Sequence, residues 1–282
     1  MIPSLEEARR HFAEELRVTA HMGNDRLVEA FAAVPRETFA GPGPWRLLNS
    51  WDGYWTTPDQ EPHWLYHNVL VALDEKRRLN IGEPNLWAYQ LDRIALGEGE
   101  RVLQIGTGSG YFTAILAETV GRGGRVDAIE IDEALAARAT RNLEPWPAAT
   151  VHPGDAAVPI DGEWDVVVAF AGATAPQAWW LDRLADGGRL LLPMTVADFA
   201  ITGFMLRLDR QGDDLLARSV GRVGFYPCIG ARTSEGEAAL RQALGDTAGQ
   251  HALRCLRRDP HDKDESCWLH GDGWCLSKRT LH

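Results

Sequence analysis

The sequence predicts an α/β fold with a mainly parallel sheet, and two observations lead to this prediction. Between about residue 101 and residue 193 the expected elements alternate between strand and helix, a pattern typical of crossover units. Within this stretch Val166-Val167-Val168 is a continuous apolar run, as expected for a strand that helices cover on both faces. We therefore divide the chain into a cap and lid (residues 1–95), a core that holds the sheet (96–200) and a C-terminal extension (201–282).

The first segment is expected to form a helical hairpin followed by a lid. Apolar residues recur at helical spacing over residues 3–33, with a break at Gly23-Asn24-Asp25. From residue 35 to about residue 80 the periodicity fades and Pro, Gly and Trp accumulate, which favours an irregular segment over the substrate side of a binding site. The alternative is that its tryptophans form only a satellite core: Trp45, Trp51, Trp55 and Trp64. A helix is expected over residues 83–96.

The core is expected to hold strands and helices in alternation. Strands are predicted at residues 101–105, 125–130, 150–152, 165–170 and 189–193, and helices at 111–120, 133–143 and 175–185. Beyond it we expect one or two strands over residues 199–223, with a turn at 209–214. The tail at residues 267–276 is too apolar for a free end, so we expect it to pack on the body of the protein.

Composition excludes several classes of protein. The 282 residues are 45% hydrophobic and 24% charged, which is ordinary for a folded chain. A formal net charge of −11 opposes nucleic-acid binding, which depends on neutralising phosphates. The longest apolar run, residues 166–171, is too short to span a bilayer, and the N-terminus lacks the pattern of a secretory signal, so we expect a cytoplasmic protein. Four late cysteines are expected to be reduced thiols: Cys228, Cys255, Cys267 and Cys275.

A glycine-rich turn is the sharpest local signal. The buried strand Val102-Leu103-Gln104-Ile105 runs into Gly106-Thr107-Gly108-Ser109-Gly110 and then into a helix that begins at Tyr111. Glycines there let a ligand lie against the backbone at a helix N-terminus. A dinucleotide fingerprint needs a glycine at position 111, and a phosphate loop needs Lys-Ser/Thr after the turn. The spacing therefore fits an S-adenosylmethionine site better than either.

Three carboxylates follow at positions where an adenosyl ligand would need them. Glu130 ends the second strand, where it can accept hydrogen bonds from both ribose hydroxyls. Asp155 follows the third strand and could accept from the adenine amino group, while Asp165 opens the fourth strand near the carbon to be transferred. A carboxylate at a strand end is usually a solvated cap, but the three in this order favour a cofactor site.

With these motifs the chain resembles the protein-L-isoaspartate O-methyltransferases. The resemblance covers about residues 10–200 and rests on segments in the family's order: Val34-Pro35-Arg36-Glu37-Thr38-Phe39, Ile81-Gly82-Glu83-Pro84, the glycine turn, Ala128-Ile129-Glu130, Gly154-Asp155, Ala173-Thr174-Ala175-Pro176 and Gly187 to Pro193. It implies a Rossmann-like class I methyltransferase sheet with a helical N-terminal cap and a C-terminal extension. It also implies that residues 79–82 and Trp87 border the cofactor.

Three departures from the family pattern predict a different acceptor. Members usually carry a serine at the position of Gly82, whose hydroxyl belongs to the isoaspartyl site, and an acidic residue at the position of Gln104. The stretch from residue 41 to residue 80 is also longer and richer in tryptophan. We therefore expect inefficient isoaspartyl repair, and a gain of activity in Gly82→Ser would support the missing hydroxyl as the reason.

Other kinds of site are less well supported. Cys267, His270 and Cys275, with His261 upstream, could ligate zinc, but the spacing is irregular and the sequence has no Cys-x-x-Cys pair, so no metal site is expected. His63 and His67 would share one helical face as ligands or as a base, and a structural role is the alternative. A serine hydrolase is not indicated, because the sequence has no Gly-x-Ser-x-Gly.

The sequence thus predicts an S-adenosyl-L-methionine-dependent enzyme that O-methylates a carboxylate on a small molecule or peptide. The alternatives are a true protein-L-isoaspartate O-methyltransferase and a non-catalytic cofactor-binding protein. No nucleic-acid or membrane partner is expected, the oligomeric state stays open and no catalytic residue is assigned, because an ionised carboxylate needs no general base. The expected cofactor contacts are Ile81, Gly82, Trp87, Gln104, Gly106, Thr107, Gly108, Ser109, Gly110, Tyr111, Glu130, Ile131, Asp155 and Ala156, and the expected substrate contacts are Trp55, His63, Glu83 and Asn85.

Overall fold

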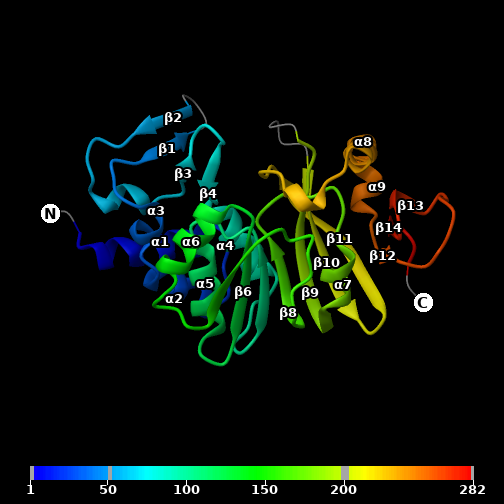
Figure 1. Ribbon diagram of the computed structural model, residues 1–282, viewed down its shortest axis with the longest axis horizontal. Helices are drawn as coiled ribbons and strands as arrows, with labels where there is room; N and C mark the ends of the chain where they lie inside the picture. Colours follow the sequence, from blue (N-terminus) through cyan, green and yellow to red (C-terminus); the bar gives the residue numbers. More distant parts are fainter. Residues whose placement is uncertain (1–2, 50–52, 198–202, 281–282) are drawn as a thin grey trace. The chain divides into compact units, whose positions relative to one another are not determined.

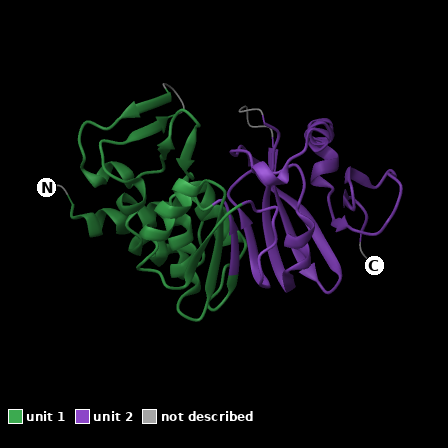
Figure 2. Cartoon of the chain, viewed as in Figure 1, with its two compact units in different colours: residues 1–101, 107–154 green, residues 102–106, 155–282 purple. Residues whose placement is uncertain are grey.

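The computed structural model describes residues 3–49, 53–197 and 203–280. The chain forms two compact units, unit 1 at Met1–Arg101 and Thr107–Gly154 and unit 2 at Val102–Gly106 and Asp155–His282 (Figure 2). The three-segment division at residues 95/96 and 200/201 stays a prediction. Among the described residues, no helix is long and apolar enough to cross a membrane.

Unit 1 opens with the predicted helical hairpin, α1 (Leu5–Thr19) and α2 (Asp25–Ala33) (Figure 1). Ser4 and Glu7 form a reciprocal capping box at the start of α1, and the Asn24 side chain caps α2. The two helices pack through buried aromatic rings, including an edge-to-face pair between Phe12 and Phe31 with centroids 6.3 Å apart. The hairpin prediction is confirmed.

The expected irregular lid is instead a small sheet, which corrects the prediction. After α3 (Arg36–Ala40), four short strands pair antiparallel in the order β2-β1-β3-β4, with a 3-10 turn η1 (Pro62–Leu65) between them. These strands are β1 (Arg46–Asn49), β2 (Gly53–Thr56), β3 (Leu70–Asp74) and β4 (Leu79–Ile81). Strands of three to five residues without alternating burial leave no period to read in the sequence. Trp51 lies outside the described residues.

The rest of unit 1 follows the predicted order closely. It consists of α4 (Pro84–Arg93), α5 (Tyr111–Val120), β6 (Arg125–Glu130), α6 (Glu133–Asn142) and β7 (Ala149–Pro153). β6 and β7 pair in parallel, with Glu130 opposite Pro153, and α5 is buried along almost its whole length. The apolar stretch at residues 111–120 therefore lies in the core and is not a surface helix.

Unit 2 holds a mixed sheet rather than a mainly parallel one. Its strands lie in the order β5-β8-β9-β10-β11-β12-β14-β13. β5 (Arg101–Ile105), β8 (Trp164–Ala169) and β9 (Leu184–Met194) are parallel, whereas β10 (Gly203–Gln211), β11 (Asp214–Val223) and the last three strands pair antiparallel. β9 begins five residues earlier than predicted and accordingly leaves room for only a short helix, α7 (Ala178–Asp182).

The tail packs on the unit as predicted. The last strands are β12 (Cys255–Arg257), β13 (Cys267–Gly271) and β14 (Trp274–Ser277), and the connecting helices are η2 (Ile229–Ala231), α8 (Ser234–Ala243) and α9 (Thr247–His251). Cys275 and Leu276 are fully buried, and the Trp268 indole donates a 3.0 Å hydrogen bond to the carbonyl of Asp246. The tail thus extends the antiparallel half of the sheet.

Candidate functional site

The glycine turn is held in a conformation that requires glycine. Gly106, Gly108 and Gly110 all have positive φ angles, of 84°, 59° and 96°. At Gly110, the N-cap of α5, a Cβ would also lie 3.2 Å from the side chain of Leu143, the C-cap of α6. The turn therefore runs close to α6 and leads into the N-terminus of α5, whose first backbone N–H groups have no side-chain cap.

Glu130 lies beside this turn at the carboxyl end of β6. Its Oε2 accepts the backbone N–H of Gly108 at 2.7 Å, and its Oε1 accepts that of Asp132 at 3.0 Å. The side chain is buried, and this burial raises the pKa of Glu130 although the backbone N–H groups oppose the shift. A carboxylate has about four acceptor positions, so two bonds leave capacity for further donors.

Buried polar atoms without partners surround the turn. Thr107 Oγ1 and Ser109 Oγ in unit 1 have no hydrogen-bond partner among the described residues, and both side chains are almost fully buried. In unit 2, Gln104 donates from Nε2 to the carbonyl of Gly106 at 3.2 Å, while its buried Oε1 lacks a partner in that same described part of the chain. Such atoms are costly unless a bound group satisfies them.

Gly82 is crowded by the residues that the family resemblance places beside the cofactor. It follows β4, whose last residue, Ile81, is 4% exposed. A Cβ on Gly82 would lie 2.7 Å from Trp87 Nε1 and 3.1 Å from Phe112 Cε2. Trp87 is itself 1% exposed and packs on Phe112 with ring centroids 5.9 Å apart. The space of a serine side chain is therefore occupied by the indole ring.

The side chain of Tyr111 is directed into the core. Its ring packs edge-to-face on Phe39, and the guanidinium of Arg36 lies 5.6 Å from its centroid. Burial raises the pKa of the Tyr111 hydroxyl above its ordinary value. Any contact of Tyr111 with a ligand would therefore come from its backbone.

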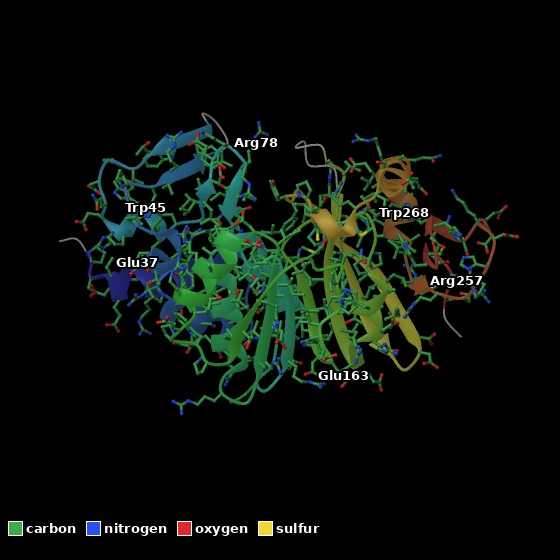
Figure 3. The ribbon with its side chains drawn as sticks, in the orientation of Figure 1. Glu37, Trp45, Arg78, Glu163, Arg257 and Trp268 are labelled. Carbon is green, nitrogen blue, oxygen red and sulfur yellow. The ribbon has the colours of Figure 1, made fainter. Side chains whose placement is uncertain are left out.

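The Arg36 side chain explains the Val-Pro-Arg-Glu-Thr-Phe motif. It is completely buried and donates to the carbonyls of Leu65, His67 and Val69 at 2.6 to 3.0 Å. Next to it, the carboxylate of Glu37, which is labelled in Figure 3, accepts a hydrogen bond from the hydroxyl of Tyr66. The motif thus fastens the segment before β3 to α3.

The expected cofactor contacts Asp155 and Ala156 lie in unit 2, and the structure corrects the expected position of Asp165. Asp155 accepts the backbone N–H of Ala157 at 2.8 Å and lies so close to Gly230 that a Cβ there would clash with its carboxylate. The carbonyl of Ala156 accepts both indole N–H groups of Trp179 and Trp180. Asp165 lies at the start of β8, level with the start of β5 and about 13 Å of strand from its carboxyl end. It is therefore not placed near the end of β5, where the glycine turn begins.

The expected substrate residues form local contacts in unit 1. Asn68, which the sequence did not indicate, donates to Glu83 and accepts from the backbone of Asn85, both at 2.9 Å. Trp55 packs edge-to-face on Trp64. His63 lies in a 3-10 turn and contacts the carbonyl of Pro3 at 2.7 Å, and His67 lies beyond that turn, so the two do not share a helical face.

The small sheet reaches the glycine turn through β3 and its loop. A Cβ on Gly108 would lie 3.6 Å from Leu73 Cδ1, and Arg77 forms a 2.5 Å ion pair with Asp132, the N-cap of α6. Ile131, next to Glu130, is 43% exposed and can contact an apolar ligand face. Leu73 and Arg77 carry no sequence signal, because their role depends on long-range contacts.

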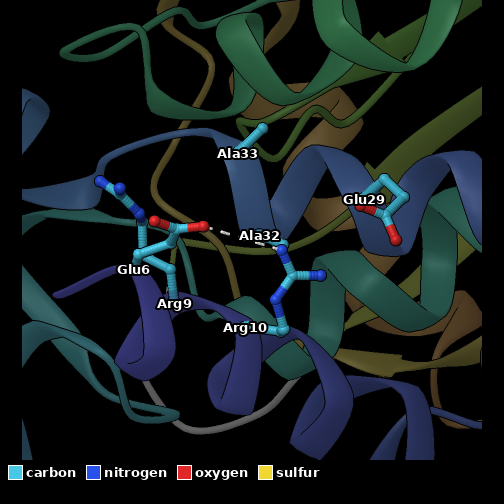
Figure 4. Close-up of a pocket in the computed structure, with 6 residues that line it drawn as sticks. All are labelled: Glu6, Arg9, Arg10, Glu29, Ala32 and Ala33. Atoms are coloured by element: carbon cyan, nitrogen blue, oxygen red, sulfur yellow. Dashed lines mark ion pairs between the residues drawn. The ribbon is translucent and has the colours of Figure 1, made fainter. Parts of the chain in front are cut away.

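A pocket lies on the surface of the helical hairpin. Its volume is about 220 Å³, and it is lined by Glu6, Arg9, Arg10, Glu29, Ala32 and Ala33 (Figure 4). The ion pair between Arg10 and Glu6 spans 4.0 Å between largely exposed groups, so it contributes little. This pocket is not where the residues described above converge.

The chain is similar to known proteins over most of its length. The family model described as protein-L-isoaspartate(D-aspartate) O-methyltransferase matches residues 7–233. Protein-L-isoaspartate O-methyltransferase 2 of Pelobacter propionicus is 35% identical over 210 residues (73% of this chain, 83% of the relative). The protein of the same name from Syntrophobacter fumaroxidans is 32% identical over 238 residues (82% and 85%).

Solved structures share the fold. A protein-L-isoaspartate O-methyltransferase superimposes with a TM-score of 0.65 at 23% identity, covering 78% of this chain and 65% of that one. A putative protein-L-isoaspartate O-methyltransferase from Plasmodium falciparum, in complex with S-adenosyl-L-homocysteine, gives a TM-score of 0.60 at 17% identity (78% and 97%). With a family model that spans most of its length, the chain belongs to the protein-L-isoaspartate(D-aspartate) O-methyltransferase family.

Proposed function

We propose that this chain is an S-adenosyl-L-methionine-dependent carboxyl O-methyltransferase whose acceptor is an isoaspartyl residue in a peptide or protein. The observation that carries the proposal is Glu130, which is buried at the end of β6 and bonded to the backbone of the glycine turn. The names of the relatives favour the isoaspartyl acceptor, which was the alternative in the sequence-based prediction.

The residues of unit 1 fit the cofactor at named atoms. The free acceptor positions of Glu130 would take the ribose hydroxyls. The buried hydroxyls of Thr107 and Ser109 and the backbone N–H groups at the start of α5 would take the carboxylate end of the methionine moiety. Ile131 offers apolar surface for adenine. The contacts proposed for Gln104, Asp155 and Ala156 in unit 2 stay predictions.

Catalysis in this proposal is chiefly positioning. The cofactor supplies an electrophilic methyl group, and an acceptor carboxylate is already ionised near neutral pH, so the protein has no proton to remove. The chain contributes by holding donor and acceptor in line and excluding water. This is consistent with the lack of an assigned general base.

A methyl-transfer assay tests the proposal. Isoaspartyl and aspartyl forms of one peptide are supplied with labelled cofactor, and transfer to the isoaspartyl form alone is expected. Glu130→Gln should lose transfer because cofactor affinity falls, whereas Glu118→Gln, a control on the same unit whose carboxylate binds the Trp146 indole, should keep it. Cofactor binding without transfer to any carboxylate would refute the enzymatic proposal in favour of a binding protein.

One observation favours a second acceptor. Trp87 fills the space that a serine at position 82 would need, so no hydroxyl can be offered there to an isoaspartyl carboxylate. An acceptor carboxylate on a small molecule, or on a peptide with an apolar neighbour, would suit this indole-lined edge. Transfer to such carboxylates but not to the isoaspartyl peptide would identify this second function.

A further inference from the structure

Four potential metal ligands converge in the C-terminal part of unit 2. They are His261, Cys267, His270 and Cys275, and their ligand atoms all lie within 4.8 Å of one another. The cluster belongs to the β12–β14 region, where Arg257 and Trp268 are labelled in Figure 3. The family match ends at residue 233, so this cluster lies outside the part of the chain that defines the family.

A β-bulge brings the strand residues to one face. Cys267 and His270 are three residues apart, and in a regular strand they would point to opposite faces. The register shifts between Cys267 and Leu269, so that Cys267 pairs with Ser277 while His270 pairs with Cys275. The extra residue, Trp268, turns Cys267 onto the face of His270 and Cys275. The irregular spacing in the sequence therefore does not keep the side chains apart.

The fourth residue completes a compact set. His261, from the β12–β13 connection, places Nε2 3.5 Å from the Sγ of Cys267, and its ring lies 5.0 Å from that of His270 at 88°. Zinc bound to nitrogen at about 2.0 Å and to sulfur at about 2.3 Å in a tetrahedron separates those ligands by about 3.5 Å. The observed separation matches this value.

The surrounding contacts prepare the ligand atoms. His261 Nδ1 lies 2.7 Å from the carbonyl of Asp259, a bond that makes Nδ1 the donor and leaves the Nε2 lone pair free. His270 Nδ1 is buried without a hydrogen-bond partner among the described residues. The backbone N–H of Asp264 donates to Cys267 Sγ at 3.4 Å, which stabilises a thiolate. The contacts of His261 Nδ1 and Cys267 Sγ are typical of the outer shell of a metal site, and the unpartnered Nδ1 of His270 is available as a ligand atom.

We propose that this cluster is a structural zinc site with two histidine and two cysteine ligands. Two thiolates balance the charge of one Zn²⁺, and nitrogen with sulfur in a tetrahedral set favours zinc over magnesium or calcium. Four protein ligands leave no open position for a substrate, so the role is structural. The ion would fasten the β12–β13 connection to the β13–β14 hairpin, whose strands are only four and five residues long.

The metal content of the full-length protein tests this proposal. The chain is purified under reducing conditions, incubated with zinc, dialysed and measured by elemental analysis. We expect about one zinc per chain in the wild type. Cys255→Ser is the matched control, because Cys255 is equally buried in β12 but donates to the carbonyl of Arg279 outside the cluster. The zinc content of Cys275→Ser and of His270→Ala should be lower than that of the wild type by about tenfold or more, whereas Cys255→Ser should keep the wild-type content.

A second measurement keeps the test decisive if a ligand variant fails to fold. Wild-type protein loaded with Co²⁺ should show the intense visible bands of a tetrahedral site and sulfur-to-cobalt charge transfer, and a chelator should lower its melting temperature. The proposal is overturned if the wild type retains no zinc, if zinc survives at the wild-type level in Cys275→Ser and His270→Ala, or if mass spectrometry finds a Cys267–Cys275 disulfide in freshly purified protein.

Discussion

Replacing Gly82 with serine should destabilise the protein without increasing its isoaspartyl activity. The added Cβ would lie 2.7 Å from Trp87 Nε1, 2.8 Å from Trp87 Cδ1 and 3.1 Å from Phe112 Cε2, distances below or at the edge of normal contact. Trp87 is 1% exposed, so its ring cannot move aside without disturbing the packing of α4. The expectation from sequence that Gly82→Ser would gain isoaspartyl activity therefore meets a steric obstacle, because the indole occupies the space of the added side chain.

The size of the effect follows from the overpacking. Extra atoms forced into a packed site cost about 1–3 kcal/mol, which lowers the melting temperature of a chain of this size by roughly 2–12 °C. Gly23→Ser is the matched control, because a Cβ on Gly23 meets nothing within 4 Å and its backbone is not in the left-handed region. The control should stay within about 0.5 kcal/mol of the wild type.

Thermal unfolding and methyl transfer to an isoaspartyl peptide are measured for both variants. A double-mutant cycle with Trp87→Leu isolates the clash, since the cost of Gly82→Ser should shrink when the indole is removed. If Gly82→Ser has the same melting temperature as the wild type and transfers methyl groups faster than the wild type, the indole does not occupy the serine position and the steric reasoning fails.

Three further outcomes are expected. Glu130→Gln should weaken S-adenosylhomocysteine binding about 10- to 100-fold by calorimetry, because charge-assisted bonds to the ribose are lost; unchanged affinity would contradict the assignment. The affinity of the wild type for S-adenosylhomocysteine should decline as pH falls through the raised pKa of Glu130. The contribution of Glu130 to the stability of the ligand-free protein has the opposite trend and is lost as pH rises through that pKa. In Glu130→Gln the dependence of affinity on pH should be flatter than in the wild type. Arg36→Met should cost about 3 kcal/mol in denaturant unfolding, because it leaves one buried and two partly buried carbonyls without their donor, while Arg10→Met, at an exposed site, should cost almost nothing.

The elements around the glycine turn could be predicted from sequence because local signals agree there. Arg101–Ile105, Tyr111–Val120 and Arg125–Glu130 have the predicted bounds, since apolar runs are punctuated by glycines that permit positive φ. The position of Glu130 at the end of its strand followed directly. Its hydrogen bond to Gly108 did not, because it joins residues 22 positions apart.

The small sheet and the antiparallel half of the large one lie beyond such local reasoning. Alternation of strand and helix predicts parallel pairing, but after β9 successive strands pair through hairpins, and only long-range pairing distinguishes the two arrangements. Likewise, the prediction that Asp165 lies near the transferred carbon rests only on its position in the sequence after Glu130 and Asp155. The register of β8 puts it at the end of the strand remote from the glycine turn.

Spacing rules for metal motifs fail for a related reason. They assume that a short interval such as Cys-x-x-Cys brings two ligands together within one turn of the backbone. In this chain the cluster at residues 261–275 is instead assembled by a cross-strand pair and a β-bulge. His270 and Cys275 are opposite each other because the hairpin turns at Gly271 to Trp274, and Cys267 joins them because one extra residue inverts the parity of its strand. If β13 paired regularly with β14 over this stretch, Trp268 would lie opposite Ser277 and Cys267 would face away from the other ligands. Deleting Trp268 would leave Cys267 two residues before His270 on the same face of a regular strand, so this variant should still retain zinc although the interval between the two ligands has changed.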